Sequence, residues 1–297
     1  MLLRIGYEFQ FDLTGTTPMV LMLHTHPDQA HVLRLPEVVK TEPELPVHTF
    51  TDTFGNRAAR LIAPAGKVRI TYDNVAWDSG LHEPTIQGQR LHLIEELPDH
   101  VLPYLMGSRY CEVDRLGPIA WDLFGKLPPT WERVQAIMDF VHSHITFGYK
   151  FARVNKTAHD VWYEKKGVCR DYQHLAITLM RAMNIPARYA TGYLGDIGVP
   201  ADGLPMDFSA WMEVYLGNKW WTLDARHNTP RIGRVLMARG RDATDVALTT
   251  SFGPARLEKF VVHMDEVAED LVTPIDSFKV AGPSTPAPSP APMPVAA

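Results

Sequence analysis

The sequence predicts an α+β fold, in which an antiparallel β domain comes first and a helix packed on an antiparallel sheet follows. Apolar side chains alternate with polar ones from Leu3 to Leu13, which is the two-residue period of a half-buried strand. Much later, apolar residues recur every three or four positions from Tyr172 to Met183, the period of a helix. Short strand-like runs come directly after that helix, so both element types contribute to the second part.

Residues 1–80 are predicted to form the small antiparallel β domain. Val20–Leu23 is a short apolar run, and the run Val68, Ile70 and Tyr72 alternates again with polar residues. Gly and Asn in the segment 53–56 tolerate the positive φ of a tight turn, so this segment is predicted to join two strands as a hairpin.

Residues 81–128 are predicted to be a connector with short helices because proline interrupts them repeatedly. The core is predicted over 129–275. One helix is expected after Thr130 and a second after Thr157, with Gly167 as the C-terminal cap of the second helix.

Three strands are expected after the third helix of the core. They cover 188–194, 210–216 and 219–223, and Gly217-Asn218 is the two-residue turn between the last two. One more strand is expected at Leu257–Met264. Residues 276–297 are predicted to be a Pro/Ala-rich disordered tail, because six prolines and no charge occur in the last fifteen residues.

Composition excludes several classes of protein. The 297 residues hold 29 Lys and Arg against 34 Asp and Glu, a net charge of −5, so no nucleic-acid partner is expected. No apolar stretch is long enough to cross a membrane, and a cytoplasmic location is the expectation. With two cysteines and no CxxC, HExxH, phosphate loop or GxGxxG pattern, no metal and no cofactor are predicted. The sequence gives no oligomeric state.

Cys169 is the candidate nucleophile, because it stands at the predicted start of the third helix. The positive end of the helix dipole favours a thiolate, and a thiolate is the attacking form of cysteine. A lowered pKa and fast alkylation are therefore expected. The alternative is that Cys169 is a small buried apolar residue, which is the role expected for Cys111.

Several segments, among them the one that contains Cys169, resemble the bacterial transglutaminase-like superfamily. They are Gly167–Ala176 with Ala182–Tyr189, Ala210–Leu216 with Trp220–Asp224, Ala238–Asp242 with Asp245-Val246, and the turn Asp52–Asn56. The resemblance covers roughly residues 1–270. It implies a papain-like core and thiol-dependent acyl chemistry on a peptide or amide, with Cys169 as nucleophile and Asp224 as the family aspartate.

One position departs from the family pattern. The family histidine directly precedes the Ala-Trp pair, and this chain has Ser209 there, which cannot serve as a general base. If Gly217-Asn218 is the hairpin turn, Asp224 faces Trp211 and lies diagonal to Ser209. His227, three residues past Asp224, is predicted to fill the vacated place. A surface histidine is the alternative, and His174 is a weaker candidate base.

Two functions remain open on these residues. The first is hydrolysis of an amide by Cys169, His227 and Asp224, as a peptidase or amidase rather than a crosslinking enzyme. The second is a binding module without catalysis, because the family histidine position is Ser209.

The uncharged tail generates a prediction about stability. A segment that cannot bury a core adds nothing to folding free energy, so deletion of Pro283–Ala297 is expected to leave the melting temperature unchanged. Differential scanning calorimetry of the full chain and the shortened chain measures this. A loss of several degrees would show that the tail packs on the folded part.

Overall fold

The computed structural model describes residues 1–86, 88–201, 203 and 205–268, so the predicted tail 276–297 lies outside the described residues. The architecture is α+β, as predicted, with three four-stranded antiparallel sheets and a short parallel pair, β7 with β8. The strands are β1 (Leu2–Leu13), β2 (Thr17–Leu21), β3 (Lys40–Glu42), β4 (His48–Thr51), β5 (Arg57–Ala63), β6 (Gly66–Trp77), β7 (Thr146–Phe147), β8 (Lys166–Gly167), β9 (Ala187–Tyr193), β10 (Ser209–Leu216), β11 (Lys219–Leu223), β12 (Val235–Gly240), β13 (Thr249–Ser251) and β14 (Ala255–Val267). The helices are α1 (Val113–Phe124), α2 (Trp131–His144), α3 (Ala158–Glu164) and α4 (Cys169–Ala182), and four short 3-10 helices cover Pro27–Val32, Ile94–Glu96, Asp99–Leu105 and Tyr149–Phe151.

The N-terminal strands form two sheets that share one core. Their orders are β14-β1-β6-β3 and β13-β2-β5-β4. The alternating residues that predicted β1 and β6 are buried, as expected for strands with one face on a core: Leu3, Ile5, Tyr7, Phe9, Phe11, Leu13, Val68, Ile70 and Tyr72. The predicted hairpin between β4 and β5 is present, and Gly55 has a φ of 84° there.

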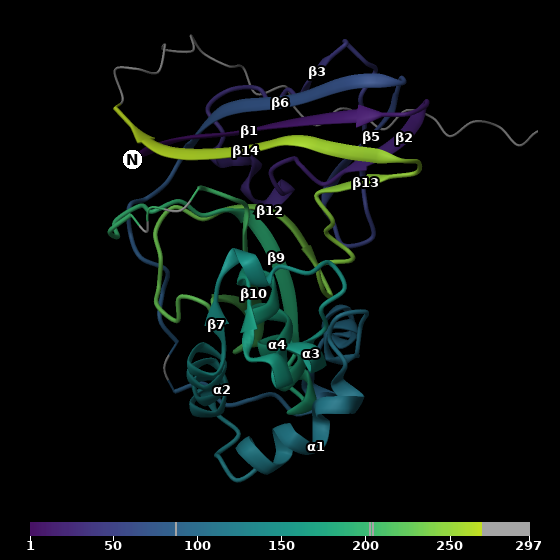
Figure 1. Cartoon of the computed structure of the whole chain (residues 1–297). Helices are drawn as coiled ribbons and strands as arrows, with labels where there is room; N and C mark the ends of the chain where they lie inside the picture. Colours follow the sequence, from purple (N-terminus) through teal and green to yellow (C-terminus); the bar gives the residue numbers. More distant parts are fainter. Residues whose placement is uncertain (87, 202, 204, 269–297) are drawn as a thin grey trace, which may run out of the picture.

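The last strands belong to this first part of the fold. The sequence places a strand near Leu257–Met264 within the predicted core 129–275, but β14 pairs along its whole length with β1, and β13 pairs with β2 (Figure 1). This differs from the predicted division at residue 80. Two strands that are far apart in the sequence can pair along their edges in one sheet. The hydrophobic period of a strand shows which face is buried, but it does not show which strand pairs with its edge.

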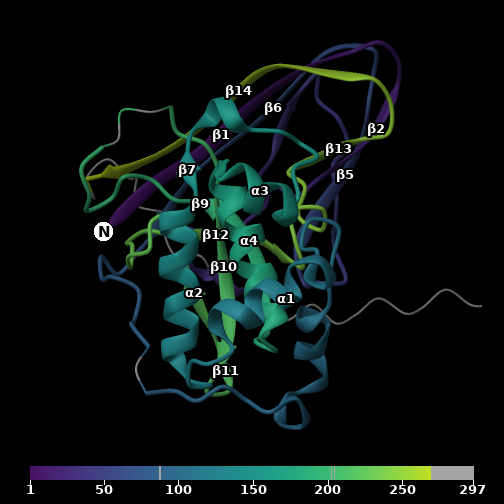
Figure 2. The same cartoon turned by 60° about the horizontal axis from the view of Figure 1, so that its bottom comes forward.

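The third sheet, β11-β10-β9-β12, carries α4 on one face (Figures 1 and 2). The predicted hairpin register is confirmed, because Leu216 faces Lys219 and Met212 faces Leu223. Gly217 and Asn218 both have positive φ, 57° and 62°, as a type I′ turn requires.

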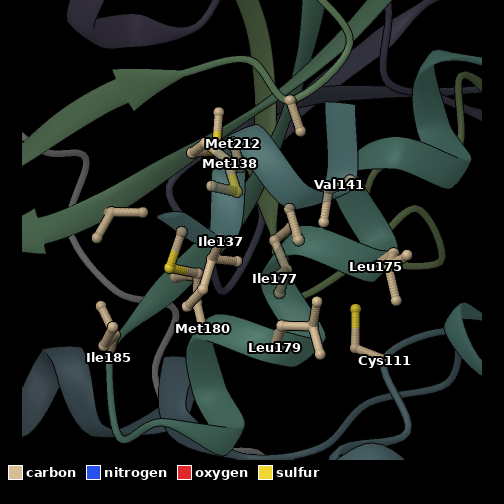
Figure 3. Packing of buried hydrophobic residues seen from close by; sticks show 14 of the residues in the cluster. Cys111, Ile137, Met138, Val141, Leu175, Ile177, Leu179, Met180, Ile185 and Met212 are labelled. Atoms are coloured by element: carbon tan, nitrogen blue, oxygen red, sulfur yellow. The ribbon is translucent and has the colours of Figure 1, made fainter. Parts of the chain in front are cut away.

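Helix α4 is enclosed on all sides. The sequence predicted one apolar face, but every residue from Asp171 to Ala182 is buried, because α1, α2 and α3 cover what the sheet leaves open (Figure 2). Figure 3 shows its apolar side chains interlocked with those of α2 and with Met212 of β10. Cys111 lies in the same cluster and is fully buried, which agrees with the structural role expected for it.

The helix termini follow the predicted caps with one exception. The Thr130 hydroxyl accepts a hydrogen bond from the Glu132 amide, and Thr157 forms a capping box with Asp160. The C-terminal cap of α3 is Lys165, with φ of 53°, and not Gly167. Gly167 instead lies in β8, where a Cβ atom would come within 2.5 Å of the Asp171 side chain, so a close approach to α4 requires this glycine.

Phe208 joins the two parts of the molecule. Its ring lies 5.0 Å from that of Tyr193 in β9 and 6.1 Å from that of Tyr7 in β1, between ring centroids, and the three rings share the core of the N-terminal sheets. The Asn56 side chain also donates to the Arg239 carbonyl and accepts from its amide. Because Phe208 directly precedes Ser209, the contact between the two parts fixes the start of β10.

None of the helices in the described part is long and apolar enough to cross a membrane.

The close approach at Gly6 in β1 generates a prediction. A Cβ atom at Gly6 would lie 2.3 Å from the His263 ring and 2.4 Å from the Tyr72 carbonyl oxygen. We expect Gly6→Ala to lower the free energy of unfolding by about 1–3 kcal/mol, since overpacking forces backbone shifts. Gly15→Ala is the matched control because nothing lies within 4 Å of that position. Urea denaturation compares the two; equal stabilities would contradict the prediction.

Candidate active site

Cys169 is the first residue of α4 and stands at the junction of two cavities. Its side chain is partly buried, and it lines one cavity of about 520 Å³ and another of about 470 Å³. The helix begins here because the Asp171 carboxylate accepts a hydrogen bond from the Val168 amide, which satisfies one of the free N–H groups at the N-terminus. The predicted location of Cys169 at a helix start is therefore observed.

The expected lowering of the Cys169 pKa is wrong for this state of the protein. Burial, together with a smaller contribution from the nearby Asp207 carboxylate, raises the pKa of the thiol to about 11. The Ala210 backbone and the Arg226 guanidinium act in the opposite direction, but they are outweighed. Loss of water around the sulfur thus raises the thiol pKa by more than the helix N-terminus lowers it. The thiol is neutral near pH 7 and needs a base before it can attack.

Asp224 follows β11 directly and carries a buried negative charge. Its Oδ2 atom accepts hydrogen bonds from His227 Nδ1 at 2.8 Å and from Arg234 Nη2 at 2.9 Å, and Oδ1 accepts from Gln173 Nε2 at 3.0 Å. Burial alone would raise the pKa of this carboxyl, but the charge of Arg234 and the bond from His227 hold it well below its usual range. Asp224 is ionised at any physiological pH.

A turn brings His227 back to Asp224. The Asn228 amide donates to the Asp224 carbonyl at 2.7 Å, and Asn228 has φ of 51°, so the chain coils there instead of continuing as a strand. In a coiled turn, side chains three residues apart lie on the same side, whereas strand alternation would separate them. The His227 side chain remains 22% exposed.

His227, Cys169 and Ser209 line one cavity. Asp207 and Arg226 line it as well, and it is the cavity of about 520 Å³. The Ser209 side chain is buried, and its hydroxyl has no hydrogen-bond partner within the residues that the structure describes. Three of the four residues that the sequence singled out therefore line one cavity, and the fourth, Asp224, is bonded to His227.

Two residues that the sequence analysis did not identify hold Asp224. Gln173 also donates to the Ala210 carbonyl and accepts from the Ala225 amide, so it ties α4 to β10 and to the loop after β11. It is four residues after Cys169, one helical turn, and this spacing could have revealed it. Arg234 stacks on Trp211 at 4.9 Å and also pairs with Glu83. No local pattern predicts Arg234, because the contact joins separate segments.

His174, the weaker candidate base, is packed inside the fold. His174 is fully buried and stacks on Tyr110, and burial lowers its pKa, so it stays neutral. Its Nε2 atom accepts from the Ala243 amide, which leaves it as a packing element and not a base. Within the described part of the chain, no three His, Cys, Asp or Glu side chains are grouped as metal ligands.

Comparison with known proteins agrees with this architecture. The sequence profile of the Transglutaminase-like superfamily matches residues 120–225, which include Cys169, Ser209 and Asp224. The crystal structure of a "putative cysteine protease" from Cytophaga hutchinsonii is 28% identical, with a TM-score of 0.77 over 94% of this chain and 95% of that one. Residues 120–225 belong to the Transglutaminase-like superfamily. This membership supports thiol-dependent acyl chemistry in general.

Curated relatives are mycobacterial. An uncharacterized protein of Mycobacterium leprae is 25% identical over 223 residues, which are 70% of this chain and 77% of the relative. An uncharacterized protein of Mycobacterium tuberculosis is 25% identical over 127 residues, 40% of each chain. The superfamily profile ends at residue 225, so His227 and Arg234 lie beyond the segment that it matches.

The buried charge of Asp224 generates a prediction about pH. Its pKa is depressed in the folded state, so its contribution to stability is complete above the unfolded pKa near 4 and is lost as the pH falls below that value. Between about pH 6 and about pH 3, wild type is expected to lose about 1 kcal/mol more free energy of unfolding than Asp224→Asn. Denaturant titrations at each pH measure the slope.

The slope separates this effect from a general loss of stability in the variant. Asp122→Asn removes an exposed carboxylate and is the control for losing one titrating group. Parallel pH profiles for wild type and Asp224→Asn would show that the Asp224 charge does not contribute.

Proposed function

We propose that the protein is a cysteine hydrolase of amides, a peptidase or amidase, in which Cys169 attacks, His227 is the base and Asp224 orients His227. The observation that carries the proposal is the 2.8 Å contact between His227 Nδ1 and Asp224 Oδ2, beside a cavity that His227 shares with Cys169. The family position for histidine is Ser209, so the imidazole comes from a different point of the chain.

The Asp224 contact sets the proton on the His227 ring. An ionised carboxylate can only accept a hydrogen bond, so Nδ1 of the neutral ring is the donor and Nε2 keeps its lone pair. Nε2 can therefore take the proton of the thiol. This is the role that a neutral Cys169 requires, because its raised pKa leaves little thiolate in advance.

The proposed reaction has two steps. In the first step, the Cys169 proton moves to His227, sulfur bonds to the amide carbon, and the proton then passes to the leaving nitrogen as the C–N bond breaks. In the second step, water attacks the thioester, its proton moves to His227 and returns to sulfur, and the acid is released. Backbone N–H groups at the start of α4 are available to the developing oxyanion.

A second candidate function is a binding module without catalysis. Two observations favour it: Ser209 occupies the family histidine position, and the Cys169 pKa is raised. The two functions differ in one respect that can be measured, because only the hydrolase needs His227 to control the reactivity of Cys169.

Alkylation of Cys169 by iodoacetamide tests the role of His227. We expect His227→Ala to slow alkylation near pH 7 by about tenfold or more, because loss of the base leaves only the small thiolate fraction. Amide turnover should be lost together with it, and Asp224→Ala should weaken both by releasing the ring. Mass spectrometry of the labelled peptide measures the rate.

Two variants control this experiment. Cys169→Ser gives the background, since Cys111 is fully buried, and His48→Ala removes an exposed histidine from β4. If His227→Ala is alkylated as fast as wild type at every pH, the base role is wrong and the binding module remains.

A further inference from the structure

The two cavities that meet at Cys169 differ in character. The larger, called here the polar pocket, is lined by charged and imidazole side chains that include Asp196, Arg226, His227, Arg231 and His263. The smaller, called here the apolar pocket, is lined by Phe9, Val168, Leu248, Leu257 and Phe260 among others. The walls common to both are Tyr149, Cys169, Asp207, Phe208 and Ser209. A substrate bound across the sulfur therefore meets a different surface on each side.

Strand β14 supplies the apolar wall from outside the catalytic core. Leu257 and Phe260 are 49% and 36% exposed, although both are large and apolar. The register of β14 against β1 shifts at Glu258, where two residues of β14 oppose one step of β1. Such a bulge re-aims the side chains next to it, which explains how Leu257 and Phe260, three residues apart, line the same pocket.

The position of His227 indicates which end of a substrate lies in which pocket. It lines the polar pocket and is not among the residues of the apolar pocket. In amide cleavage by a thiol, the imidazole must reach the leaving nitrogen to protonate it, so the leaving group lies on the imidazole side of the sulfur. The acyl group then lies on the opposite side, against Leu257 and Phe260.

We propose that the enzyme selects amides whose acyl part carries a large apolar side chain, such as Phe or Leu, and whose leaving amine is polar. The assignment rests on the proposed function, because the direction comes from His227. Covering the exposed Leu257 and Phe260 with an apolar side chain removes apolar surface from water, which favours such substrates.

Cleavage of a defined set of internally quenched peptides tests the proposal. The residue on the acyl side is Phe, Leu, Gly or Asp, with Ser constant on the leaving side. We expect kcat/KM to be about tenfold or more higher after Phe or Leu than after Gly or Asp. Leu257→Asp should lower kcat/KM for the Phe peptide by a similar factor and leave the Gly peptide nearly unchanged. Equal rates for all peptides, or faster cleavage after Gly or Asp than after Phe or Leu, would overturn the proposal.

Val261→Asp is the matched control for Leu257→Asp. Val261 lies on the same strand, is 43% exposed and lines neither pocket. The same new charge there is expected to change no peptide's kcat/KM. If both variants act alike, the effect of Leu257→Asp is a general effect of charge on β14 and the assignment fails.

A second measurement does not depend on turnover. Peptide aldehydes place only an acyl part beside the sulfur, so a Phe aldehyde is expected to protect Cys169 from iodoacetamide at about tenfold lower concentration than a Gly aldehyde. If the aldehydes discriminate and no peptide is cleaved, the proposed hydrolysis fails while the apolar pocket stands. If they do not discriminate, the pocket assignment is wrong whether or not peptides are cleaved.

Discussion

A buried carboxylate, Asp224, organises the site. A charge removed from water is tolerated only when partners replace its hydration, and Asp224 has His227, Arg234 and Gln173 as those partners. Each partner comes from a different segment: the turn after β11, the residue directly before β12 and the second turn of α4. The need to satisfy one charge therefore fixes the mutual positions of the helix that carries Cys169, the sheet and the loop that carries His227.

The same burial has opposite effects on the two titrating groups. For Asp224, cationic and hydrogen-bonding partners outweigh the loss of water and the group stays charged. For Cys169, no comparable partner opposes burial, and the sulfur stays protonated. In the proposed reaction, the fixed anion, the neutral thiol and an imidazole whose tautomer is set by the anion favour proton transfer during attack over a thiolate that exists beforehand.

Local patterns predicted what depends on local physics. Periodicity found β1, α2 and α4, the hairpin turn gave the register of β10 with β11, and the helix start located Cys169. Local patterns did not predict the contacts between distant segments. These are the pairing of β14 with β1, the enclosure of α4 by the other helices, and the bond from Arg234 to Asp224. The predicted lowering of the Cys169 pKa is wrong for the same reason, because segments distant in the sequence bury the sulfur and this burial outweighs the helix dipole. Gln173 is different, because its one-turn spacing from Cys169 was available in the sequence.

The position of β14 has a consequence for biosynthesis. Strands β1 and β14 lie side by side, yet they are among the first and last parts of the described chain to leave a ribosome. A growing chain can complete the segment from Cys169 to Asp224 well before Leu257 and Phe260 have emerged. Until then β1 has an unpaired edge and the sulfur faces a groove with one wall absent. Synthesis of β14 thus pairs the free edge of β1 and adds the Leu257 and Phe260 wall of the apolar pocket at the same time.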